Sequence, residues 1–290
     1  VELQKTFSKK RFINAIQTNG LLVNDEFVEF FKEHAFLVGV SLDGPQAIHD
    51  SVRIDKAGNG TFQRIAENLE LLKGQNLSIG ILATIARHNV KHAKELYDFL
   101  RNNSLSTTFS VLFPSGRARD NIDHLSISPS EYSDFLVKIM DLWMRDTNPT
   151  EMRTIELILC NLLADGQRGK TCIFSKKCHE SFLAIGPTGD LYPCCLFQGY
   201  EKFKYGNIHE TSLSQIAETP VWRAMEERVG YIDHECGQCD IQEYCHGGCA
   251  FNALATHGTI LKKDCYCAAY KKAIPRMVNM LGNLIGGMNQ

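Results

Sequence analysis

The sequence predicts an α/β protein of two domains, in which a parallel sheet is followed by a cysteine-rich module. Short apolar runs alternate with amphipathic segments along the first 150 residues, which indicates strands joined by right-handed helical crossovers. Ten of the eleven cysteines then lie between Cys172 and Cys267. The glycines of residues 166–169 interrupt the helical spacing between the two regions. We therefore expect domains at residues 1–165 and 166–290.

Four apolar runs rich in Ile, Val, Leu and Phe are predicted to form the buried strands of the sheet. They comprise residues 12–17, 36–42, 78–84 and 107–113. Helical spacing occupies residues 25–34, 61–73, 90–101, 128–145 and 150–164. The last segment, residues 273–290, is expected to be an apolar docking helix.

Composition excludes several classes of function. The chain has 290 residues, of which 44% are hydrophobic and 22% charged, and its formal net charge is -2. Without a basic run, nucleic acid is not an expected partner. No apolar run approaches the roughly 20 residues that span a bilayer, so we expect no membrane contact. Abundant free thiols in a ligand-like pattern predict a reducing, cytoplasmic location.

The cysteine spacing is typical of a scaffold for metal ions or iron-sulfur clusters. A Cys-x2-Cys step lets two thiolates of one turn reach a common ion or cluster. The pattern reads Cys172-x5-Cys178-x15-Cys194, then Cys236-x2-Cys239-x5-Cys245-x3-Cys249, then Cys265-x-Cys267. An upstream trio, a quartet and one tail cysteine supply the eight thiolates that two four-thiolate sites need. Cys160, Cys195 and either Cys265 or Cys267 are left over.

Iron-sulfur clusters are favoured over the two alternatives. The uneven x2, x5, x3 spacing of the quartet is similar to that of two-cluster ferredoxins, in which one cysteine crosses to the other cluster. Disulfides are disfavoured because the pairs are too close in sequence for a secreted staple pattern. Two structural zinc ions are the other alternative, since Cys-x2-Cys spacing alone does not distinguish zinc from iron.

The cysteine pattern resembles the seven-cysteine SPASM module of radical S-adenosylmethionine (SAM) maturases. The resemblance rests on Cys178-x10-Gly189-x4-Cys194, the quartet, and a final cysteine before Ala268-Ala269-Tyr270-Lys271. It implies two auxiliary [4Fe-4S] clusters. The first would be held by Cys172, Cys178, Cys194 and Cys249, and the second by Cys236, Cys239, Cys245 and Cys267. Cys267 is preferred over Cys265 because the family's last ligand directly precedes such a segment of small residues, Tyr and Lys.

Polar and turn residues follow each predicted strand, at the sheet edge where parallel α/β proteins bind ligands. They are Thr18-Asn19-Gly20, Ser41-Leu42-Asp43-Gly44-Pro45, Thr84 with Arg87 and Asn89, and Pro114-Ser115-Gly116-Arg117. Each motif alone is explained as a turn. Together with Ile48-His49-Asp50, Arg53 and Gly60-Thr61-Phe62, they resemble the (β/α)6 radical SAM barrel of anaerobic sulfatase maturases and peptide maturases.

In that barrel Thr-Asn-Gly ends the third strand and Ser-x-Asp-Gly-Pro the fourth, so the resemblance implies a partial barrel that misses its first strands. It also implies that Ser41 and Arg53 contact the carboxylate and ribose region of SAM, and that Asp43 shapes the site. A hydroxyl and a guanidinium group suit a carboxylate. The alternative for Arg53 is a surface ion pair that contributes little to stability.

The family's Cys-x3-Cys-x2-Cys loop, which binds the SAM-cleaving cluster, and its Gly-Gly-Glu segment are absent from the sequence. Two strand-helix units comprise about 60 residues. We therefore expect Val1 to lie inside the second barrel helix of a longer protein, with the present chain inactive alone and one sheet edge unpaired. The alternative is a degenerate member of the family without radical activity.

Cys195 departs from the sulfatase maturases, which carry an aspartate directly after the corresponding cysteine. A thiol is less available as a base at neutral pH than an ionised carboxylate. The departure favours an enzyme that modifies ribosomally made peptides through thioether or carbon-carbon crosslinks. Cys195 is its candidate catalytic residue, and the alternative for Cys195 is a buried small hydrophobe.

The resemblance implies that the intact enzyme uses SAM, a third [4Fe-4S] cluster and an electron donor such as flavodoxin or ferredoxin. Formylglycine formation in sulfatases is the alternative activity. A non-catalytic, iron-sulfur or zinc-stabilised binding module is the alternative from another class. His179, His246 and His257 are expected to form hydrogen bonds or face solvent. Gly247-Gly248 is expected to allow close passage of the backbone around a cluster.

Overall fold

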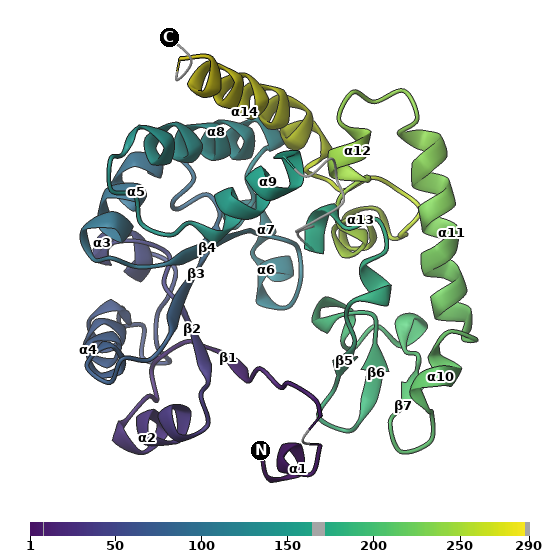
Figure 1. Cartoon of the computed structure of the whole chain (residues 1–290), viewed down its shortest axis with the longest axis horizontal. Coiled ribbons are helices and arrows are strands. Elements are labelled where there is room, and N and C mark those ends of the chain that lie inside the picture. The colour runs from purple at the N-terminus through teal and green to yellow at the C-terminus, as the bar shows by residue number, and fades with distance from the viewer. Residues whose placement is uncertain (8, 164–171, 288–290) are drawn as a thin grey trace. The chain divides into compact units, whose positions relative to one another are not determined.

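The computed structural model describes residues 1–7, 9–163 and 172–287 (Figure 1). The chain divides into two compact units. Unit one comprises residues 1–112, 124–127 and 134–156, and unit two comprises residues 113–123, 128–133 and 157–290. The boundary expected at residues 166–169 lies outside the described residues.

Unit one contains a parallel four-stranded sheet in the order β1-β2-β3-β4, which confirms the predicted α/β class. Its strands are β1 (Ala15–Thr18), β2 (Leu37–Ser41), β3 (Ile79–Ile85) and β4 (Thr107–Val111). Strand β1 begins at Ala15 rather than at residue 12, because its pairing with β2 begins at Ala15 and Leu37. The preceding Phe12 and Ile13 are exposed. Among the described residues, β1 pairs only with β2, so its outer edge is the unpaired one expected from the sequence.

The helices between the strands confirm the predicted alternation. They are α2 (Asp25–Glu33), α3 (Gln46–Asp50), α4 (Phe62–Lys73) and α5 (Ala93–Asn102). Figure 1 shows the strands side by side in chain order, with these helices along one side of them. Asn24 begins α2 because its side chain accepts a hydrogen bond from the Phe27 amide at 3.0 Å. The remaining helices before residue 164 are α1 (Glu2–Lys5), α6 (Arg117–Asp120), α7 (Ile122–Leu125), α8 (Pro129–Arg145) and α9 (Arg153–Leu163).

Side chains alternate across the sheet, as strand geometry requires. In β3, Ile81, Ala83 and Ile85 are buried, whereas the residues between them are only half-buried. Ser41 of β2 lies on the face opposite the buried Val40. One face of the sheet therefore belongs to the core, and the other presents small and polar side chains.

Unit two contains a small antiparallel sheet surrounded by helices and 3-10 turns. The sheet consists of β5 (Ala184–Ile185), β6 (Asp190–Tyr192) and β7 (Gly206–Asn207). The helices are α10 (Leu213–Ile216), α11 (Pro220–Glu235), α12 (Gln242–Cys245), α13 (Ala250–His257) and α14 (Cys267–Gly287). The 3-10 turns are η1 (Cys172–Phe174), η2 (Cys178–Glu180), η3 (Cys195–Phe197) and η4 (Glu201–Phe203).

The last helix starts earlier than the expected residue 273, which corrects the sequence prediction. Helix α14 begins at Cys267 and contains Pro275. The side chain of Asp264 accepts the Tyr266 amide at 2.8 Å, and the Cys267 amide donates to the Asp264 carbonyl. This turn starts the helix at the cysteine itself. No helix in the described part of the chain is both long and apolar enough to cross a membrane.

Candidate functional site

The four thiols predicted for the first cluster come from short turns of unit two. Cys172 and Cys178 open η1 and η2, Cys194 directly precedes η3, and Cys249 directly precedes α13. The Cys172 thiol interacts electrostatically with those of Cys178 and Cys194. Burial, followed by Asp264 and the Cys172 thiol, raises the pKa of Cys249 to about 12. The structure thus brings these four thiols together.

The second predicted set gathers where three helices begin or end. Cys236 follows α11, Cys245 ends α12 and Cys267 opens α14, with Cys239 in the intervening turn. The thiols of Cys236 and Cys239 interact with that of Cys267. Burial, followed by the Cys267 thiol, raises the pKa of Cys245 to about 12.

The Cys265 thiol lies in different surroundings. It forms side-chain hydrogen bonds with Thr256 and Asp264. Of the two alternatives for the last ligand, the structure therefore places Cys267 among the other thiols of the second set.

Backbone amides are directed at several of these sulfurs. Leu196 and Phe197 donate to Cys194, Gly247 donates to Cys245, and Phe251 and Asn252 donate to Cys249. Hydrogen bonds to ligating sulfur stabilise thiolates and influence the reduction potentials of iron-sulfur clusters.

Gly247 and Gly248 confirm the expected close passage of the backbone. Their φ angles are 75° and 71°, in the region that favours glycine. A Cβ atom on Gly247 would lie 2.7 Å from Ile232 Cδ1, and one on Gly248 would lie 2.4 Å from Asp264 Cβ. Both the conformation and the available space therefore require glycine between Cys245 and Cys249.

The separation of the sulfurs fits clusters better than single zinc ions. A tetrahedral zinc ion with bonds of about 2.3 Å holds its sulfurs roughly 3.8 Å apart. Among the described residues, no three cysteine sulfurs lie within 4.8 Å of one another. The described thiols therefore do not form a preassembled zinc site.

Two buried tyrosine hydroxyls near the thiols lack acceptors that iron-sulfur clusters would supply. Within the described residues, the hydroxyls of Tyr205 and Tyr270 have no hydrogen-bond partner. Tyr205 interacts electrostatically with Cys178 and Cys194, and Tyr270 with Cys245 and Cys249. Iron-sulfur clusters carry sulfur acceptors, which such buried donors require.

Cys195 is exposed, so the alternative of a buried small hydrophobe is wrong. It opens η3 directly after Cys194, and its thiol interacts electrostatically with that of Cys172. The residue is therefore placed beside the first thiol set with its surface accessible.

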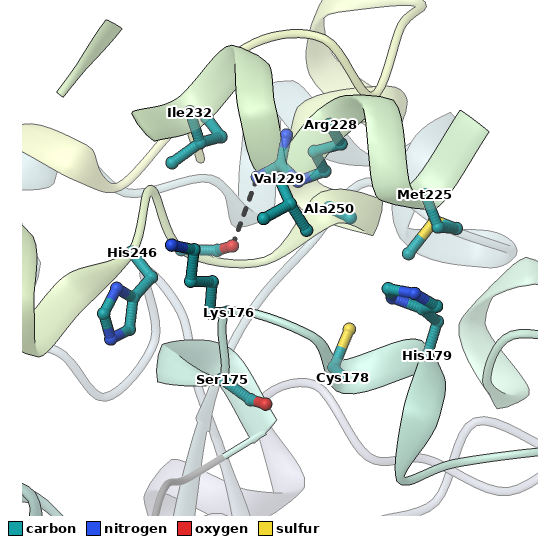
Figure 2. Close-up of a pocket in the computed structure, with 11 residues that line it drawn as sticks. Ser175, Lys176, Cys178, His179, Met225, Arg228, Val229, Ile232, His246 and Ala250 are labelled. Carbon is teal, nitrogen blue, oxygen red and sulfur yellow. Dashed lines mark hydrogen bonds between the residues drawn. The ribbon is translucent and has the colours of Figure 1, made fainter. Parts of the chain in front are cut away.

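A small pocket adjoins the first thiol set. Figure 2 shows Cys178 and His179 on one side of it, and Met225, Arg228 and Ile232 of α11 on the other. His179 is buried, and its Nε2 atom lies 2.8 Å from Glu226 Oε1. This confirms a hydrogen-bonding role for His179, whereas His257 is exposed.

In unit one, Asp43 organises the polar side chains beyond the end of β2. Its side chain, 3% exposed, accepts Arg53 Nε at 2.5 Å, Arg53 Nη2 at 3.2 Å and the Thr84 amide at 2.8 Å. His88 Nε2 lies 3.7 Å from the same carboxylate. Burial raises the pKa of Asp43, but the nearby His88 ring and the ion pair with Arg53 outweigh it and lower the pKa to about 2. The alternative of a surface ion pair for Arg53 is wrong, because its partner is buried.

Residues 48–62 form further hydrogen bonds around this ion pair. His49 Nδ1 accepts the Asp43 amide at 3.2 Å, and its Nε2 lies 3.0 Å from Thr61 Oγ1. Burial lowers the pKa of His49 to about 4, so the ring is neutral at physiological pH. Asp50 accepts the Phe62 amide at 2.8 Å and so fixes the start of α4.

Asn89 and Ser41 complete the polar end of the sheet. Buried Asn89 donates to the carbonyls of Asp43 and Thr84, at 3.1 and 2.9 Å. Ser41 accepts from Gln17 Nε2 at 3.2 Å. Sequence reasoning assigned no role to His88 or Gln17, because nothing in their local pattern indicates partners more than 20 residues away.

Known proteins resemble this chain in sequence and in structure. The model of the SPASM iron-sulfur cluster-binding domain matches residues 172–240. The chain is 27% identical over 98% of its length to the cysteine-type anaerobic sulfatase-maturating enzyme of Clostridium perfringens, 78% of which is covered. It is 28% identical over 88% of its length to the serine-type enzyme of Bacteroides thetaiotaomicron, 65% of which is covered.

Solved structures give the same result. "Native anSMEcpe with bound AdoMet and Kp18Cys peptide" superposes with a TM-score of 0.84 at 27% identity, over 97% of this chain and 80% of that one. This chain resembles radical SAM/SPASM-domain maturases. The chain shares only its fold with Streptococcus suis SuiB bound to precursor peptide SuiA, at a TM-score of 0.58 and 18% identity over 87% of this chain and 58% of that one. The matched SPASM model is that of an iron-sulfur cluster-binding domain, and the solved relative binds AdoMet.

Proposed function

We propose that this protein uses a 5′-deoxyadenosyl radical to modify the side chain or backbone of a peptide, through a thioether or carbon-carbon crosslink. The observation that carries the proposal is the gathering of eight cysteine thiols into two sets, beginning within the SPASM match. A solved relative with bound AdoMet and peptide supports a peptide as the substrate. The proposed activity requires the Cys-x3-Cys-x2-Cys motif, which this sequence lacks. We therefore expect the 290-residue chain to be inactive alone.

The proposed ligands follow the two sets of thiols. Cys172, Cys178, Cys194 and Cys249 would hold the first auxiliary cluster. Cys236, Cys239, Cys245 and Cys267 would hold the second. When bound, the clusters supply electron transfer and SAM supplies the adenosyl radical. The protein's own residues hold and orient these groups.

Arg53 and Ser41 are the proposed SAM contacts, and Asp43 positions Arg53. The Asp43 carboxylate engages Nε and Nη2 of Arg53. Nη1 has no hydrogen-bond partner among the described residues, and the Arg53 side chain is 30% exposed. A guanidinium group held along one edge by a buried carboxylate can still donate to the carboxylate of a ligand.

Cys195 is the proposed catalytic residue of the peptide reaction. Cys195 is exposed and directly follows Cys194, which by the resemblance is the position of an aspartate in the sulfatase maturases. A thiol can exchange a proton or a hydrogen atom with the substrate but is a weaker base than an ionised carboxylate. An electron donor such as flavodoxin or ferredoxin and a reducing, cytoplasmic location complete the proposal.

Formylglycine formation is the second candidate, favoured by the likeness to two anaerobic sulfatase-maturating enzymes. The two candidates differ in their products. Formylglycine formation from cysteine removes sulfur from the peptide, whereas a crosslink removes two hydrogen atoms and retains the sulfur.

The experiment uses the full-length protein, purified anaerobically and reconstituted with iron and sulfide. It is incubated with SAM, dithionite and either a Cys-x-Pro-x-Arg peptide or a precursor peptide encoded nearby. We expect 5′-deoxyadenosine and a precursor product that lacks two hydrogen atoms. Efficient formylglycine formation would favour the second candidate, and no 5′-deoxyadenosine would favour a non-catalytic module.

Three variants test the assigned residues in the same assay. Ser41→Ala and Arg53→Ala should each weaken SAM binding by about 1 to 3 kcal/mol, the range for hydrogen bonds to a charged group. Cys195→Ser should abolish turnover with the iron content unchanged. Unchanged turnover in Cys195→Ser would remove this residue from the reaction.

A further inference from the structure

Arg228 is the only buried lysine or arginine in the described part of the chain, at 6% exposure. It projects from α11 toward the turn between Cys245 and Cys249 (Figure 2). Its Nη2 atom donates to the carbonyls of Gly247 and Gly248, at 3.4 and 3.2 Å. Its Nη1 atom donates to the carbonyls of Ile260 and Lys262.

These four acceptors satisfy the hydrogen-bonding groups of Arg228 but not its charge. All four are neutral carbonyls, and no carboxylate within the described ranges lies within 4.0 Å of the guanidinium nitrogens. Burying a cation is costly unless anions nearby compensate it. The position of Arg228 therefore indicates negative charge in its immediate surroundings.

The thiols of both sets are the groups around Arg228. The pocket that Arg228 lines also contains Cys178, and the carbonyls that it binds belong to the turn leading to Cys249. Arg228 interacts electrostatically with Cys249 of the first set, then with the Asp264 carboxylate, and also with Cys178 of the first set and Cys236 of the second. The one buried carboxylate in this region, Asp264, is hydrogen-bonded to the amides of Cys249 and Tyr266.

Charge on the clusters explains this arrangement. A [4Fe-4S] cluster with four thiolate ligands is an anion, because the thiolates outweigh the positive core. One-electron reduction adds a further negative charge without a proton, so a fixed cation stabilises the reduced form more than the oxidised form. Net charge near the cluster is one of the factors that set its reduction potential.

We propose that Arg228 is the buried counter-charge of the two auxiliary clusters and raises their reduction potentials, most strongly for the cluster of Cys178 and Cys249. This inference rests on the two-cluster assignment in the proposed function. It gives Arg228 a positioning and electrostatic role rather than contact with the substrate.

The experiment compares Arg228→Gln with Arg228→Lys in the reconstituted 290-residue chain. Both replacements can donate hydrogen bonds to carbonyls, but only lysine retains the positive charge. Arg223→Gln is the control, because Arg223 lies exposed on the same helix and solvent screens its charge. Iron is counted first, and each potential is then measured by titration with dithionite, which supplies the electron, monitored by electron paramagnetic resonance.

We expect Arg228→Gln to lower the reduction equilibrium constant of the first cluster about tenfold, or about 59 mV for a one-electron couple. Arg228→Lys and Arg223→Gln should stay near the unaltered protein. If Arg228→Gln fails to retain iron while Arg228→Lys retains it, the requirement for charge is also supported.

Three results would overturn the proposal: unchanged potentials in Arg228→Gln, an equal shift in Arg228→Lys, or loss of iron from both variants. The last would assign Arg228 to hydrogen bonding of the turn alone. An unaltered protein that binds no iron would instead refute the proposed function, which keeps the two failures distinct.

Discussion

The buried ion pair of Asp43 and Arg53 makes a quantitative prediction about the stability of unit one. Asp43→Asn preserves the shape of the side chain but removes its charge. The variant keeps one oxygen that can accept the Thr84 amide, and it turns an amide donor toward the guanidinium group of Arg53. The loss of charge should therefore dominate the effect.

The size of the effect follows from the pKa of Asp43. Burial alone would raise this pKa, but the nearby His88 ring and the ion pair with Arg53 lower it from 3.8 to about 2. At about 1.4 kcal/mol per pH unit, the difference corresponds to roughly 2 to 3 kcal/mol. Little is lost to solvent screening because the Asp43 side chain is 3% exposed. Removing one partner of a buried ion pair typically costs about 3 to 5 kcal/mol, so we expect a loss of about 3 kcal/mol at neutral pH.

The dependence on pH has a definite sign. The pKa of Asp43 is depressed on folding, so its contribution is fully present above about pH 4 and is lost as the pH falls toward 2. The stabilities of the unaltered protein and of Asp43→Asn should converge over that range. Burial lowers the pKa of His49 to about 4, so both proteins lose stability as the pH falls from about 6.5 toward 4. Because the Asp43 charge raises the pKa of His49, this loss should be larger in Asp43→Asn, and the comparison is therefore made first at pH 7.

Urea unfolding followed by circular dichroism and by tryptophan fluorescence measures the difference, with Trp143 reporting from unit one. Asp98→Asn is the matched control, because Asp98 pairs with Lys94 on the exposed surface of α5 at 2.5 Å. Such i,i+4 pairs contribute about 0.3 to 0.5 kcal/mol. If Asp43→Asn lost no more stability than Asp98→Asn at pH 7, the reasoning from burial would be refuted.

Two further predictions concern unit two. Gly248→Ala should accelerate the loss of iron to a chelator. The left-handed conformation of residue 248 costs a non-glycine residue about 1 to 2 kcal/mol, and the new methyl group would collide with Asp264. Gly230→Ala is the control, because its methyl group would have no neighbour within 4 Å. Cys267→Ser should release about half of the roughly eight iron atoms, whereas Cys265→Ser should retain all of them. Iron analysis measures the difference. The opposite result would assign the last ligand position to Cys265 instead of Cys267.

The sheet was predictable because its signals are local. Each strand is an apolar run bounded by turn residues, and each predicted strand overlaps an observed one. Helix α11 was missed, although Thr219 and Pro220 are typical of a helix start and the Thr219 side chain accepts the Trp222 amide. Its buried positions, Val221, Met225, Arg228 and Ile232, have helical spacing, but the charge of Arg228 interrupts the apolar stripe.

The residues of the two sites were predictable only where they belong to a motif with recognisable spacing along the sequence. The cysteines and the motif around Asp43 are contiguous patterns, so sequence reasoning found them. Arg228 lies in a helix among other charged residues, and its partners Ile260 and Lys262 are more than 30 residues away. Only the folded structure distinguishes it from the exposed Arg223 of the same helix.

The turn between Cys245 and Cys249 explains why a buried cation and a buried anion occur together in unit two. Its carbonyls at Gly247 and Gly248 accept from Arg228, while the Cys249 amide donates to Asp264 at 2.9 Å. Opposite charges thus bind the carbonyl and the amide of the Gly248–Cys249 peptide, and both glycines of the turn have a left-handed conformation. Because the turn leads from a thiol of one set to a thiol of the other, a change at Arg228 or Asp264 should reach both sets, whereas a change at Cys172 should reach only the first.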